Sequence, residues 1–571
     1  MKLIYIFLVA LIPTFAFGQN PTLTLIRNVN VVDVRNGKLL PGTNVVVEGK
    51  LIRDVSKKQM KLPAGTEVID GTGKYLMPGL TDGHIHFFQS GGLYTRPDAI
   101  NLTNVVSYQA EIENGKRAIP DYLSRYLRLG ITTISDVGGP MRNFSIRDSL
   151  SKNHLSPDVL VTGPLFSMVS NDETTIGSDA PIVKISTIAA ADSLLEIMLP
   201  LKPDYIKIWY IVTPDLPADK TFPVVKHISD KAHQAGLKLA VHATQLQTAT
   251  LAVEAGADIL VHSVDDGPIP ESLIRIMVDR NVSYIPTLTV LGNYIKTFTG
   301  KGYQNDHDIA FGNPFFYGSL SDLEWIPSEH IPPHIKTMRE NGVPTIIERM
   351  DSMMAANLNA LSSAKVNIVA GTDAGNIGTM HASSYLNELL AMQRAGMTVP
   401  DVLRSATLNG AKAFRTNTGS VEKGKEADLV LLNENPLESL ENLTSISHIF
   451  NNGVVLKADT LISETPEMTV QRQLNAYNAR SIEAFLDTYS EDIELYTFPD
   501  KLISKGKDAL RTNYDEMFRN LNYLHCKIEK RIVLGNKIID HERVKFNDQT
   551  VQAVAVYEVE NGKIVRVTFL E

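Results

Sequence analysis

Cysteine is almost absent from this chain, whose 571 residues contain only Cys526. A single cysteine cannot form an intrachain disulfide, and it excludes zinc or redox motifs built from cysteine pairs. An excess of positive charge is also missing, because 55 Lys and Arg residues stand against 64 Asp and Glu residues and give a formal net charge of −9. Binding to the phosphates of DNA or RNA needs a basic surface, so no nucleic-acid partner is expected.

Long apolar runs are missing after the first twenty residues, so no membrane-spanning segment is expected in the rest of the chain. The N-terminal stretch has Lys2, an apolar core over 3–12, Pro13 and a small-x-small site at 16–18. That order is typical of a cleaved secretory signal peptide, and a single membrane anchor is the less favoured alternative. We therefore expect a signal peptide over 1–18 and an exported protein without stable membrane insertion. The scarcity of cysteine is compatible with a bacterial periplasm.

Two short β-rich regions flank the middle of the chain. The first covers 19–78, where Asn36-Gly37 marks a hairpin turn, and the second covers 415–460. Each region is too small to bury a hydrophobic core by itself. We therefore expect both to pack together as one composite β-sandwich domain, which would bring the two ends of the intervening region close together.

The intervening region, 79–414, alternates apolar strand-like runs with helical patterns. Eight such runs with amphipathic helices predict a TIM-like (β/α)8 barrel, an α/β fold with a parallel sheet. A doubly wound open sheet is the alternative, but no glycine-rich phosphate-binding loop follows the first strand. One connection, 291–342, shows no periodic element and is rich in aromatic residues, which indicates either an active-site cover or an oligomer contact.

The last region, 466–571, changes pattern again and is predicted to be a separate α+β domain. Helical periodicity comes first and β-rich runs follow, with a hairpin turn at Asn561-Gly562.

His84 and His86 form a His-x-His motif at the end of the first predicted barrel strand. In a strand, residues i and i+2 point to the same side, so both imidazoles can bind one metal ion. The active sites of such barrels lie at the C-terminal ends of the strands, which is where this pair falls. The motif alone is a weak signal, because two histidines also occur at this spacing by chance.

Four further strands carry polar side chains that can bind a metal. Lys207 lies in the apolar run IKIW, His242 ends LAVH, His262 follows ILV, and Asp373 follows IVAGT. Each residue alone could have a structural role, as an ion-paired lysine, a hydrogen-bonded histidine or a helix-capping aspartate. Independent accidents would not place all of them at the same end of successive strands. Together with the histidine pair they predict a metal-dependent active site.

These six residues, with the segments PGLTDGHIH, GTDAG and GSVEKGKEADLVLL, resemble the amidohydrolase superfamily of metal-dependent hydrolases. Within it, the chain is most similar to the branch that contains imidazolonepropionase-like enzymes and Xaa-Pro or Xaa-Arg dipeptidases. The resemblance covers residues 21–457. The C-terminal domain resembles the SnoaL-like, polyketide-cyclase-like cone on the segment VQRQLNAYNARSIEAFLDTYSEDIELY.

The resemblance implies two divalent metal ions, with zinc favoured and manganese, cobalt or iron accommodated. The implied ligands are His84, His86 and Asp373 for the more buried ion, and His242 and His262 for the more exposed ion. Lys207, carboxylated by carbon dioxide, would bridge the two ions as an anionic carbamate ligand. An uncarboxylated Lys207 would instead indicate a site for one metal.

The implied reaction is hydrolysis of an amide or related C–N bond in a small, peptide-like substrate. A metal-bridging hydroxide would attack the carbonyl, with Asp373 as general base and then general acid. Tyr210, which follows the IKIW strand, is a weaker candidate for binding the substrate oxyanion, since a packing role is favoured. The alternatives are a lactone or cyclic-amide hydrolase on the same site, or a non-enzymatic ligand-binding protein with a relict barrel.

The resemblance of the C-terminal domain leaves its role open. Such cones often form a pocket, and the residues that could line it are His525, Asp540, His541 and Glu542. A dimerising or accessory module, in which these side chains face solvent, is favoured over a ligand pocket. A homo-oligomer could form through the barrel or through this domain.

Overall fold

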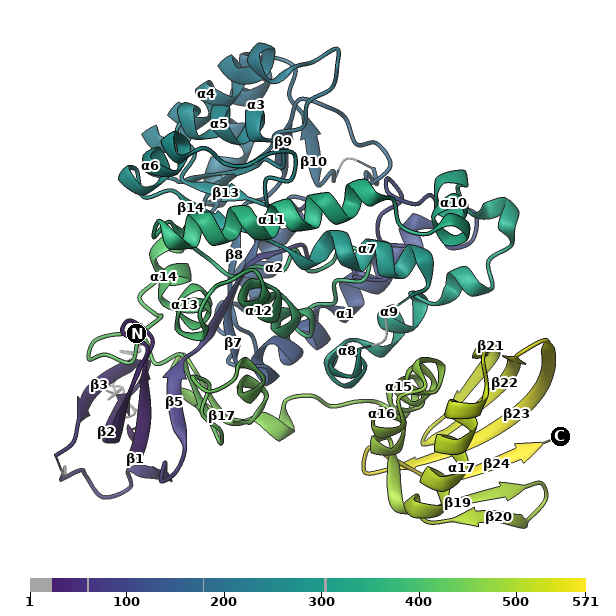
Figure 1. Cartoon of the computed structure of the whole chain (residues 1–571). Helices are drawn as coiled ribbons and strands as arrows, with labels where there is room; N and C mark the ends of the chain where they lie inside the picture. Colours follow the sequence, from purple (N-terminus) through teal and green to yellow (C-terminus); the bar gives the residue numbers. More distant parts are fainter. Residues whose placement is uncertain (1–22, 59–60, 178, 302–304, 571) are drawn as a thin grey trace, which may run out of the picture.

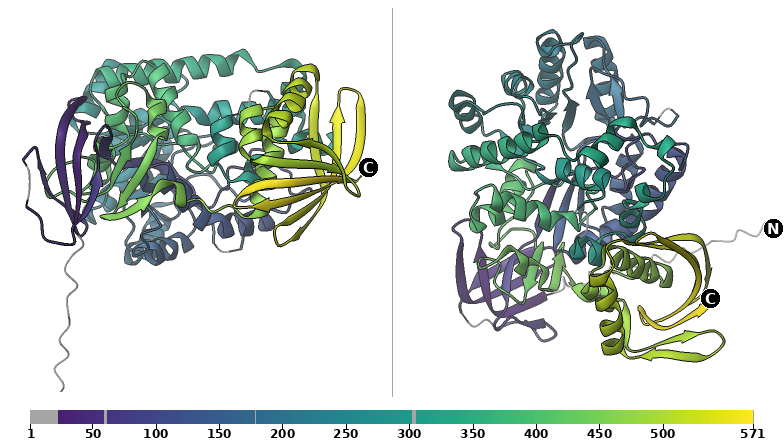
Figure 2. Two further views of the ribbon diagram at one scale, coloured as in Figure 1. Left: turned by 90° about the horizontal axis from the view of Figure 1, so that it is seen from below. Right: turned by 45° about the vertical axis from the view of Figure 1, so that its right-hand side comes forward.

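The computed structural model describes residues 23–58, 61–177, 179–301 and 305–570. The predicted signal peptide lies outside the described residues. Figure 1 shows a β-sheet region drawn mainly in purple, a central α/β region, and a C-terminal domain in yellow-green. The sheet region and the C-terminal domain lie at opposite ends of the central region (Figure 2). None of the helices in the described ranges is both long and apolar enough to cross a lipid bilayer.

Strands from both flanks of the chain form one eight-stranded sheet. They are β1 (Leu23–Asp33), β2 (Lys38–Glu48), β3 (Leu51–Ser56), β4 (Glu67–Asp70), β5 (Tyr75–Pro78), β16 (Leu429–Leu432), β17 (Ile446–Asn451) and β18 (Val454–Lys457). β5 pairs with β1 on one side and antiparallel with β16 on the other, which joins the two flanks. The core of this region is apolar and includes the fully buried Ile26, Val45 and Leu429.

The central region contains a ring of parallel strands. They are β6 (Leu80–Ile85), β7 (Ile131–Asp136), β8 (Asp158–Val161), β9 (Leu165–Ser167), β11 (Ile206–Trp209), β12 (Leu239–His242), β13 (Ile259–Val261), β14 (Ser283–Ile285) and β15 (Asn367–Ile368), with β10 (Ile182–Lys184) beside β9. One arc runs from β6 to β8 and the other from β9 to β15. Backbone hydrogen bonds from Asp204 to Val161 (3.0 Å) and from Gly83 to Ala370 (2.9 Å) join the arcs, so the ring closes. This is an α/β fold of the TIM-barrel type.

Helices cover the outside of the ring (Figure 1). They are α1 (Tyr108–Arg128), α2 (Arg142–Leu150), α3 (Ile188–Met198), α4 (Ala218–Gln234), α5 (Leu246–Ala255), α6 (Glu271–Asp279), α11 (Thr345–Ser363), α12 (Ser384–Arg394), α13 (Val399–Ser405) and α14 (Leu408–Phe414). Strands β6 and β7 are buried at every residue. Burial on both faces is typical of parallel strands that helices cover, and here it includes the threonine, serine, aspartate and histidine side chains of these two strands.

The segment 291–342 contains short helices, so the prediction of no periodic element there was wrong. They are α7 (Thr289–Thr299), α8 (Asp306–Phe311), α9 (Pro314–Ser319) and α10 (Pro333–Asn341). The side chains of Asn305 and Asn313 cap α8 and α9 by accepting hydrogen bonds from amides of the first turn. Helices of six residues are too short to show a helical hydrophobic period in the sequence.

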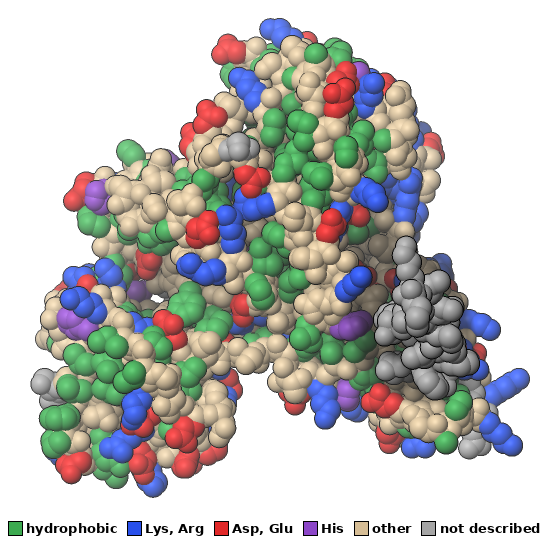
Figure 3. Space-filling view, turned by 180° about the vertical axis from the view of Figure 1, so that it is seen from behind, with side chains coloured by type: hydrophobic (Ala, Val, Ile, Leu, Met, Phe, Trp, Pro, Cys, Tyr) green, Lys and Arg blue, Asp and Glu red, His purple; other side chains and the backbone are tan. Residues whose placement is uncertain are grey.

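The C-terminal domain packs three helices on a six-stranded sheet of order β20-β19-β24-β23-β22-β21. Its elements are α15 (Pro466–Ala479), α16 (Ile482–Asp487), β19 (Tyr489–Thr497), β20 (Lys501–Lys505), α17 (Lys507–Asn520), β21 (Leu524–Leu534), β22 (Lys537–Phe546), β23 (Gln549–Glu560) and β24 (Lys563–Leu570). Two strands therefore precede α17, which corrects the expectation that all helices come before all strands. Seen from behind, the domain is a distinct lobe with hydrophobic and charged side chains interspersed on its surface (Figure 3, lower left).

The aromatic-rich segment lies between the barrel and the C-terminal domain. Helix α15 packs on α8 and α9, and Asn475 Nδ2 donates a hydrogen bond to the carbonyl oxygen of Pro314 (2.7 Å). Trp325 Nε1 donates to His525 Nδ1 (2.7 Å). Tyr523 Oη donates to Glu324 Oε2 (3.1 Å). Part of the aromatic content predicted to cover a site or form an oligomer contact is thus used in an interface within the chain.

Candidate active site

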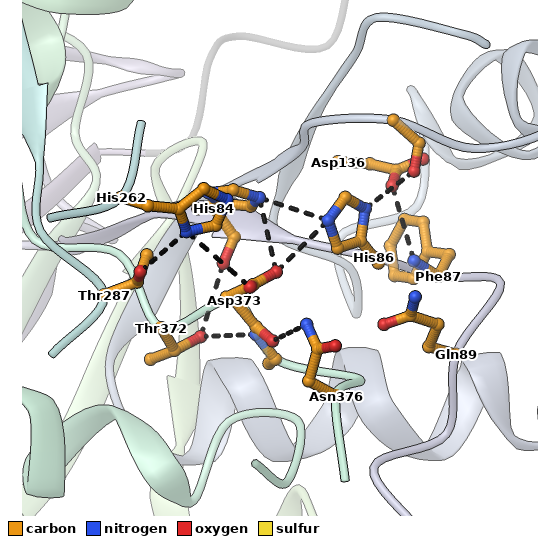
Figure 4. A network of polar contacts seen from close by, with 12 residues as sticks. His84, His86, Phe87, Gln89, Asp136, His262, Thr287, Thr372, Asp373 and Asn376 are labelled. Atoms are coloured by element: carbon orange, nitrogen blue, oxygen red, sulfur yellow. Dashed lines mark hydrogen bonds and ion pairs between the residues drawn. The ribbon is translucent and has the colours of Figure 1, made fainter. Parts of the chain in front are cut away.

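The His-x-His pair lies at the C-terminal end of β6, and both side chains approach the same point (Figure 4). The Nε2 atoms of His84 and His86 are 3.1 Å apart. His86 Nδ1 lies 2.7 Å from the carbonyl oxygen of Gly138. A carbonyl can only accept a hydrogen bond, so this contact places a proton on Nδ1 and directs Nε2 toward His84.

Asp373 reaches the same point from the loop that follows β15, the last strand of the ring. Its Oδ1 atom lies 3.3 Å from His84 Nε2 and 3.1 Å from His86 Nε2. This oxygen is buried and has no hydrogen-bond partner in the described part of the chain. The backbone N–H of Asp373 donates to the carbonyl of His84 (2.7 Å), and its φ of 58° is left-handed. The surrounding structure must enforce such a conformation at a non-glycine residue, and this is common at functional sites.

His242 and His262 lie beside this cluster, at the ends of β12 and β13. His262 Nδ1 is 3.8 Å from Asp373 Oδ2 and 2.8 Å from Thr287 Oγ1. The ring centroids of His242 and His262 are 4.4 Å apart. His84, His262 and Asp373 each offer a ligand atom, and these atoms lie within 4.8 Å of one another.

Lys207 on β11 lines the same cavity and is 1% exposed. Burial lowers the pKa of Lys207 to about 7, and the negative charge of Asp373 opposes this shift only in part. A large fraction of this amine is therefore neutral at neutral pH. An ordinary lysine is a cation under the same conditions.

Three histidines of the site, His84, His242 and His262, are neutral at physiological pH. Burial, reinforced by the positive charge of Lys207, holds the pKa of His84 and of His242 well below the usual value. Burial and the neighbouring His242 have the same effect on the pKa of His262. Neutral imidazole is the form that binds metal ions.

This set of donors fits a divalent cation. Two Nε2 atoms and a carboxylate oxygen meet in a buried space, and the oxygen has no hydrogen bond among the described residues. Leaving such atoms unpaired in the interior costs free energy, whereas one bound cation would satisfy all three. Imidazole and carboxylate ligands suit zinc, and they also accommodate manganese, cobalt or iron.

A second acidic group, Asp158, Glu426 and Asp428, lies at the opposite end of strand β8. There Lys50 Nζ lies 2.9 Å from Glu426 Oε1, so a cation from the chain already faces these carboxylates.

A polar network that the sequence did not reveal holds Asp373 in place. Asn376 Nδ2 donates to the Asp373 carbonyl (3.1 Å), and Asn376 Oδ1 accepts from Tyr294 Oη (2.8 Å) and from Arg96 Nη1. On the other side, both the N–H and the hydroxyl of Thr372 donate to Asp82, at 3.0 and 2.7 Å. Asp82 and Thr372 flank the two motifs and could have been suspected. Arg96 and Tyr294 lie in no recognisable sequence motif, so nothing in the sequence assigned them to the site.

Five of the six predicted ligands, all except the fully buried His84, line a cavity of about 480 Å3 at the C-terminal ends of the strands. Helices α7, α10 and α11 form much of its wall, which is apolar and contains Ile295, Phe298, Met338, Ile347, Met350 and Met354. Part of the segment 291–342 therefore covers the cavity, which is one of the two roles expected for it.

Several weaker candidates have other partners. Tyr210 Oη donates to the carbonyl of Ala218 (2.7 Å), and Tyr210 is absent from the residues that line the cavity, so the structure gives it a packing role. In the C-terminal domain, Glu542 lines a separate cavity of about 390 Å3. His525 instead accepts the hydrogen bond from Trp325, and Asp540 binds Arg531. Neither His525, Asp540 nor His541 lines that cavity.

Comparison with known families matches two parts of the chain. Residues 75–457 match the amidohydrolase family, and residues 470–567 match the SnoaL-like domain. The amidohydrolase family generally binds divalent metals, in agreement with the donor set described above.

Comparison with solved structures supports the fold. A Xaa-Pro dipeptidase with bound methionine in its active site is 19% identical, with a TM-score of 0.57, over 76% of this chain and all of that chain. The ochratoxinase of A. niger is 17% identical, with a TM-score of 0.58, over 77% of this chain and 97% of that chain. Among curated proteins, adenine deaminase 3 of Rhizobium meliloti is 35% identical over 72 residues. That match spans only 12% of either protein.

Proposed function

Because the chain belongs to the amidohydrolase family, we propose that this cavity hydrolyses an amide bond of a small, peptide-like substrate with the help of two divalent metal ions. The observation that carries the proposal is the convergence of Asp373 Oδ1 on the Nε2 atoms of His84 and His86, at 3.3 and 3.1 Å. The similarity to a dipeptidase with methionine in its active site supports a peptide-like substrate. Family membership favours an enzyme over a ligand-binding protein with a relict barrel.

The metal ligands in this proposal are His84, His86 and Asp373 for one ion, His242 and His262 for the other, and Lys207 between them. Bound divalent ions, with zinc favoured, would acidify water and polarise a carbonyl oxygen. The neutral histidines and the unpaired carboxylate oxygen are the donors that such ions require.

Lys207 would serve as a carbamate. Its neutral amine adds through Nζ to the carbon of carbon dioxide and releases one proton, so a new N–C bond and an anionic two-oxygen group result. A pKa of about 7 keeps a large part of the amine in the reactive neutral form at neutral pH. The reaction converts an amine, whose protonated form would repel metal ions, into a negatively charged group.

Asp373 would move the proton during hydrolysis. Its carboxylate takes a proton from the attacking water and passes it to the nitrogen that leaves when the C–N bond breaks. The hydrogen bond from Asn376 to the Asp373 carbonyl and the φ of 58° fix the backbone that carries this carboxylate. We further propose that the protein is exported after cleavage near Gly18, which the N-terminal mass of the mature protein would test.

The test is a screen of dipeptides, cyclic amides and lactones on metal-loaded protein. We expect turnover of at least one linear amide and about two metal ions per chain by elemental analysis. Turnover of lactones alone would reject the amide assignment. Protein that binds no divalent metal would reject the proposed site itself.

A further inference from the structure

Outside the predicted metal ligands, the described residues that line the catalytic cavity include two charged side chains, Arg96 and Asp265. The charge of Arg96 is already balanced, because Nε and Nη2 bind the two carboxylate oxygens of Asp98 at 2.7 and 2.6 Å. Its Nη1 atom donates to Asn376. The interactions of Arg96 are therefore with residues of the protein itself, in the network that holds Asp373 in place.

Asp265 has no such partner. Within the described ranges it forms no ion pair with a lysine, arginine or histidine, and the charged group that acts on it is the neighbouring carboxylate of Asp266. Burial and Asp266 together raise the pKa of Asp265 to about 6. A carboxylate that lines a cavity without a cation is costly to keep ionised, and a cationic ligand would offset that cost.

The position of Asp265 places it close to the reaction centre. It follows His262 by three residues, and its backbone N–H donates to the carbonyl of Thr244 (2.9 Å), which follows His242 by two residues. Both Thr244 and Asp265 line the cavity. Asp265 is therefore anchored between the strand ends that carry two of the predicted metal ligands.

The rest of the wall suits an apolar group. Helix α11 contributes Ile347, Met350 and Met354, and α10 contributes Met338. Methionine side chains are flexible and polarisable, so such a wall adapts to apolar side chains of different shape.

We propose that Asp265 binds the ammonium group of the substrate, and that the substrate is an amide of an apolar α-amino acid whose amino group is free. This inference rests on the proposed hydrolysis of an amide. An α-ammonium group lies two bonds from the scissile carbonyl carbon, so a carboxylate beside the reaction centre can reach it. The apolar wall takes the side chain of the same amino acid. Substrates with a blocked amine would leave Asp265 desolvated and unpaired.

The test compares L-leucine 4-nitroanilide with its N-acetyl derivative on the metal-loaded full chain. We expect kcat/KM of the wild type to be at least about tenfold higher for the free amine, since a charge-assisted hydrogen bond is gained. Asp265→Asn should lower kcat/KM for the free amine by about tenfold or more, mainly through KM. It should change the N-acetyl compound by less than about threefold.

The matched control is Asp266→Asn, which removes the adjacent carboxylate that does not line the cavity. It should leave the preference for the free amine intact. Equal rates on both anilides in the wild type, or an equal loss on both in Asp265→Asn, would overturn the proposal, because a purely structural role affects both substrates alike. Asp265→Glu should recover part of the preference.

Failure of the proposed function remains distinguishable. If the wild type cleaves neither anilide, calorimetry with L-leucinamide and N-acetyl-L-leucinamide decides this inference without turnover. Tighter binding of L-leucinamide that weakens about tenfold in Asp265→Asn would support it. If L-leucinamide does not bind, or if it binds equally well to the wild type and to Asp265→Asn, the inference is overturned.

Discussion

The candidate active-site cavity of the barrel and the cavity of the C-terminal domain both contain buried carboxyl groups, but their polar atoms are arranged differently. In the barrel, Asp373 Oδ1 lies among histidine nitrogens without a hydrogen bond in the described structure. In the C-terminal domain, Glu542 accepts a hydrogen bond from Tyr557 Oη (2.8 Å), and Asp540 binds Arg531 through two contacts of 2.7 Å. The carboxylate oxygen in the barrel is thus unpaired and available to a ligand, whereas the carboxyl groups of the C-terminal domain are already paired within the protein.

The largest effect is expected at Asp373. Asp373→Asn removes the group that we propose moves the proton, so kcat should fall by about 10³-fold while metal stays bound through the remaining ligands. Steady-state kinetics and elemental analysis of the same preparation check this. Glu542→Gln is the matched change in the other cavity and should alter kcat by less than about twofold. A variant at Asp373 with near-normal kcat would show that the assigned base is wrong.

The second effect concerns Lys207. Lys207→Met keeps an apolar stem of similar length but cannot form a carbamate, so the metal content should fall from about two ions per chain to one or none. In the wild type, ¹³C-labelled bicarbonate should give a carbamate carbon signal in the NMR spectrum, and the variant should lack it. A wild type with two metals and no carbamate signal would contradict the bridging role.

The third prediction uses the pKa of Glu542, which burial raises to about 7 from an ordinary 4.5. The folded state holds the proton more tightly than the unfolded state, so this group favours folding below pH 4.5 and loses that contribution as pH rises to 7. Between pH 5 and 7, the free energy of unfolding of the wild type should therefore fall by about 2 kcal/mol relative to Glu542→Gln. Denaturant titrations at both pH values measure this.

The control for that measurement is Glu494→Gln. Glu494 also accepts a hydrogen bond from a tyrosine, Tyr496 (2.9 Å), but it lies outside the cavity, and its neighbours lower its pKa. The difference in free energy of unfolding between Glu494→Gln and the wild type should not grow between pH 5 and 7. If the difference in free energy of unfolding between the wild type and Glu542→Gln is the same at both pH values, the Glu542 carboxyl of the wild type is ionised in the folded protein.

The smallest effect is expected where the two regions meet. Tyr523→Phe removes the hydrogen bond to Glu324 and should lower the free energy of unfolding by about 1 kcal/mol. Helix α10 lies close by, because Arg339 Nη2 donates to the same Glu324 side chain. If the C-terminal domain is only an accessory module, KM and kcat should stay within about twofold of the wild type. A larger change in KM would show that the domain positions the cavity wall.

The sequence predicted the α/β barrel-type fold because parallel strands buried on both faces leave continuous apolar runs, as in β13, whose residues ILV are all buried. It did not predict α8 and α9, whose six residues each are too few to show a period. It also named the six side chains of the site, because each stands at or near the end of such a run. Tyr210 was named for the same positional reason, but its hydroxyl donates a hydrogen bond to the carbonyl oxygen of Ala218.

Residue type and strand-end position were enough to determine which side chains could form the site, because strand geometry sends them all to one end of the barrel. Only the tertiary structure decided what surrounds them. Arg96, Asn376 and Asp265 come from loops whose path depends on packing against helices far away in the sequence, and no local pattern encodes such a path. Whether a buried charge is matched or left for a ligand is likewise a property of the folded chain: Arg96 is balanced by Asp98, and Asp265 by no cation in the part of the chain that is described.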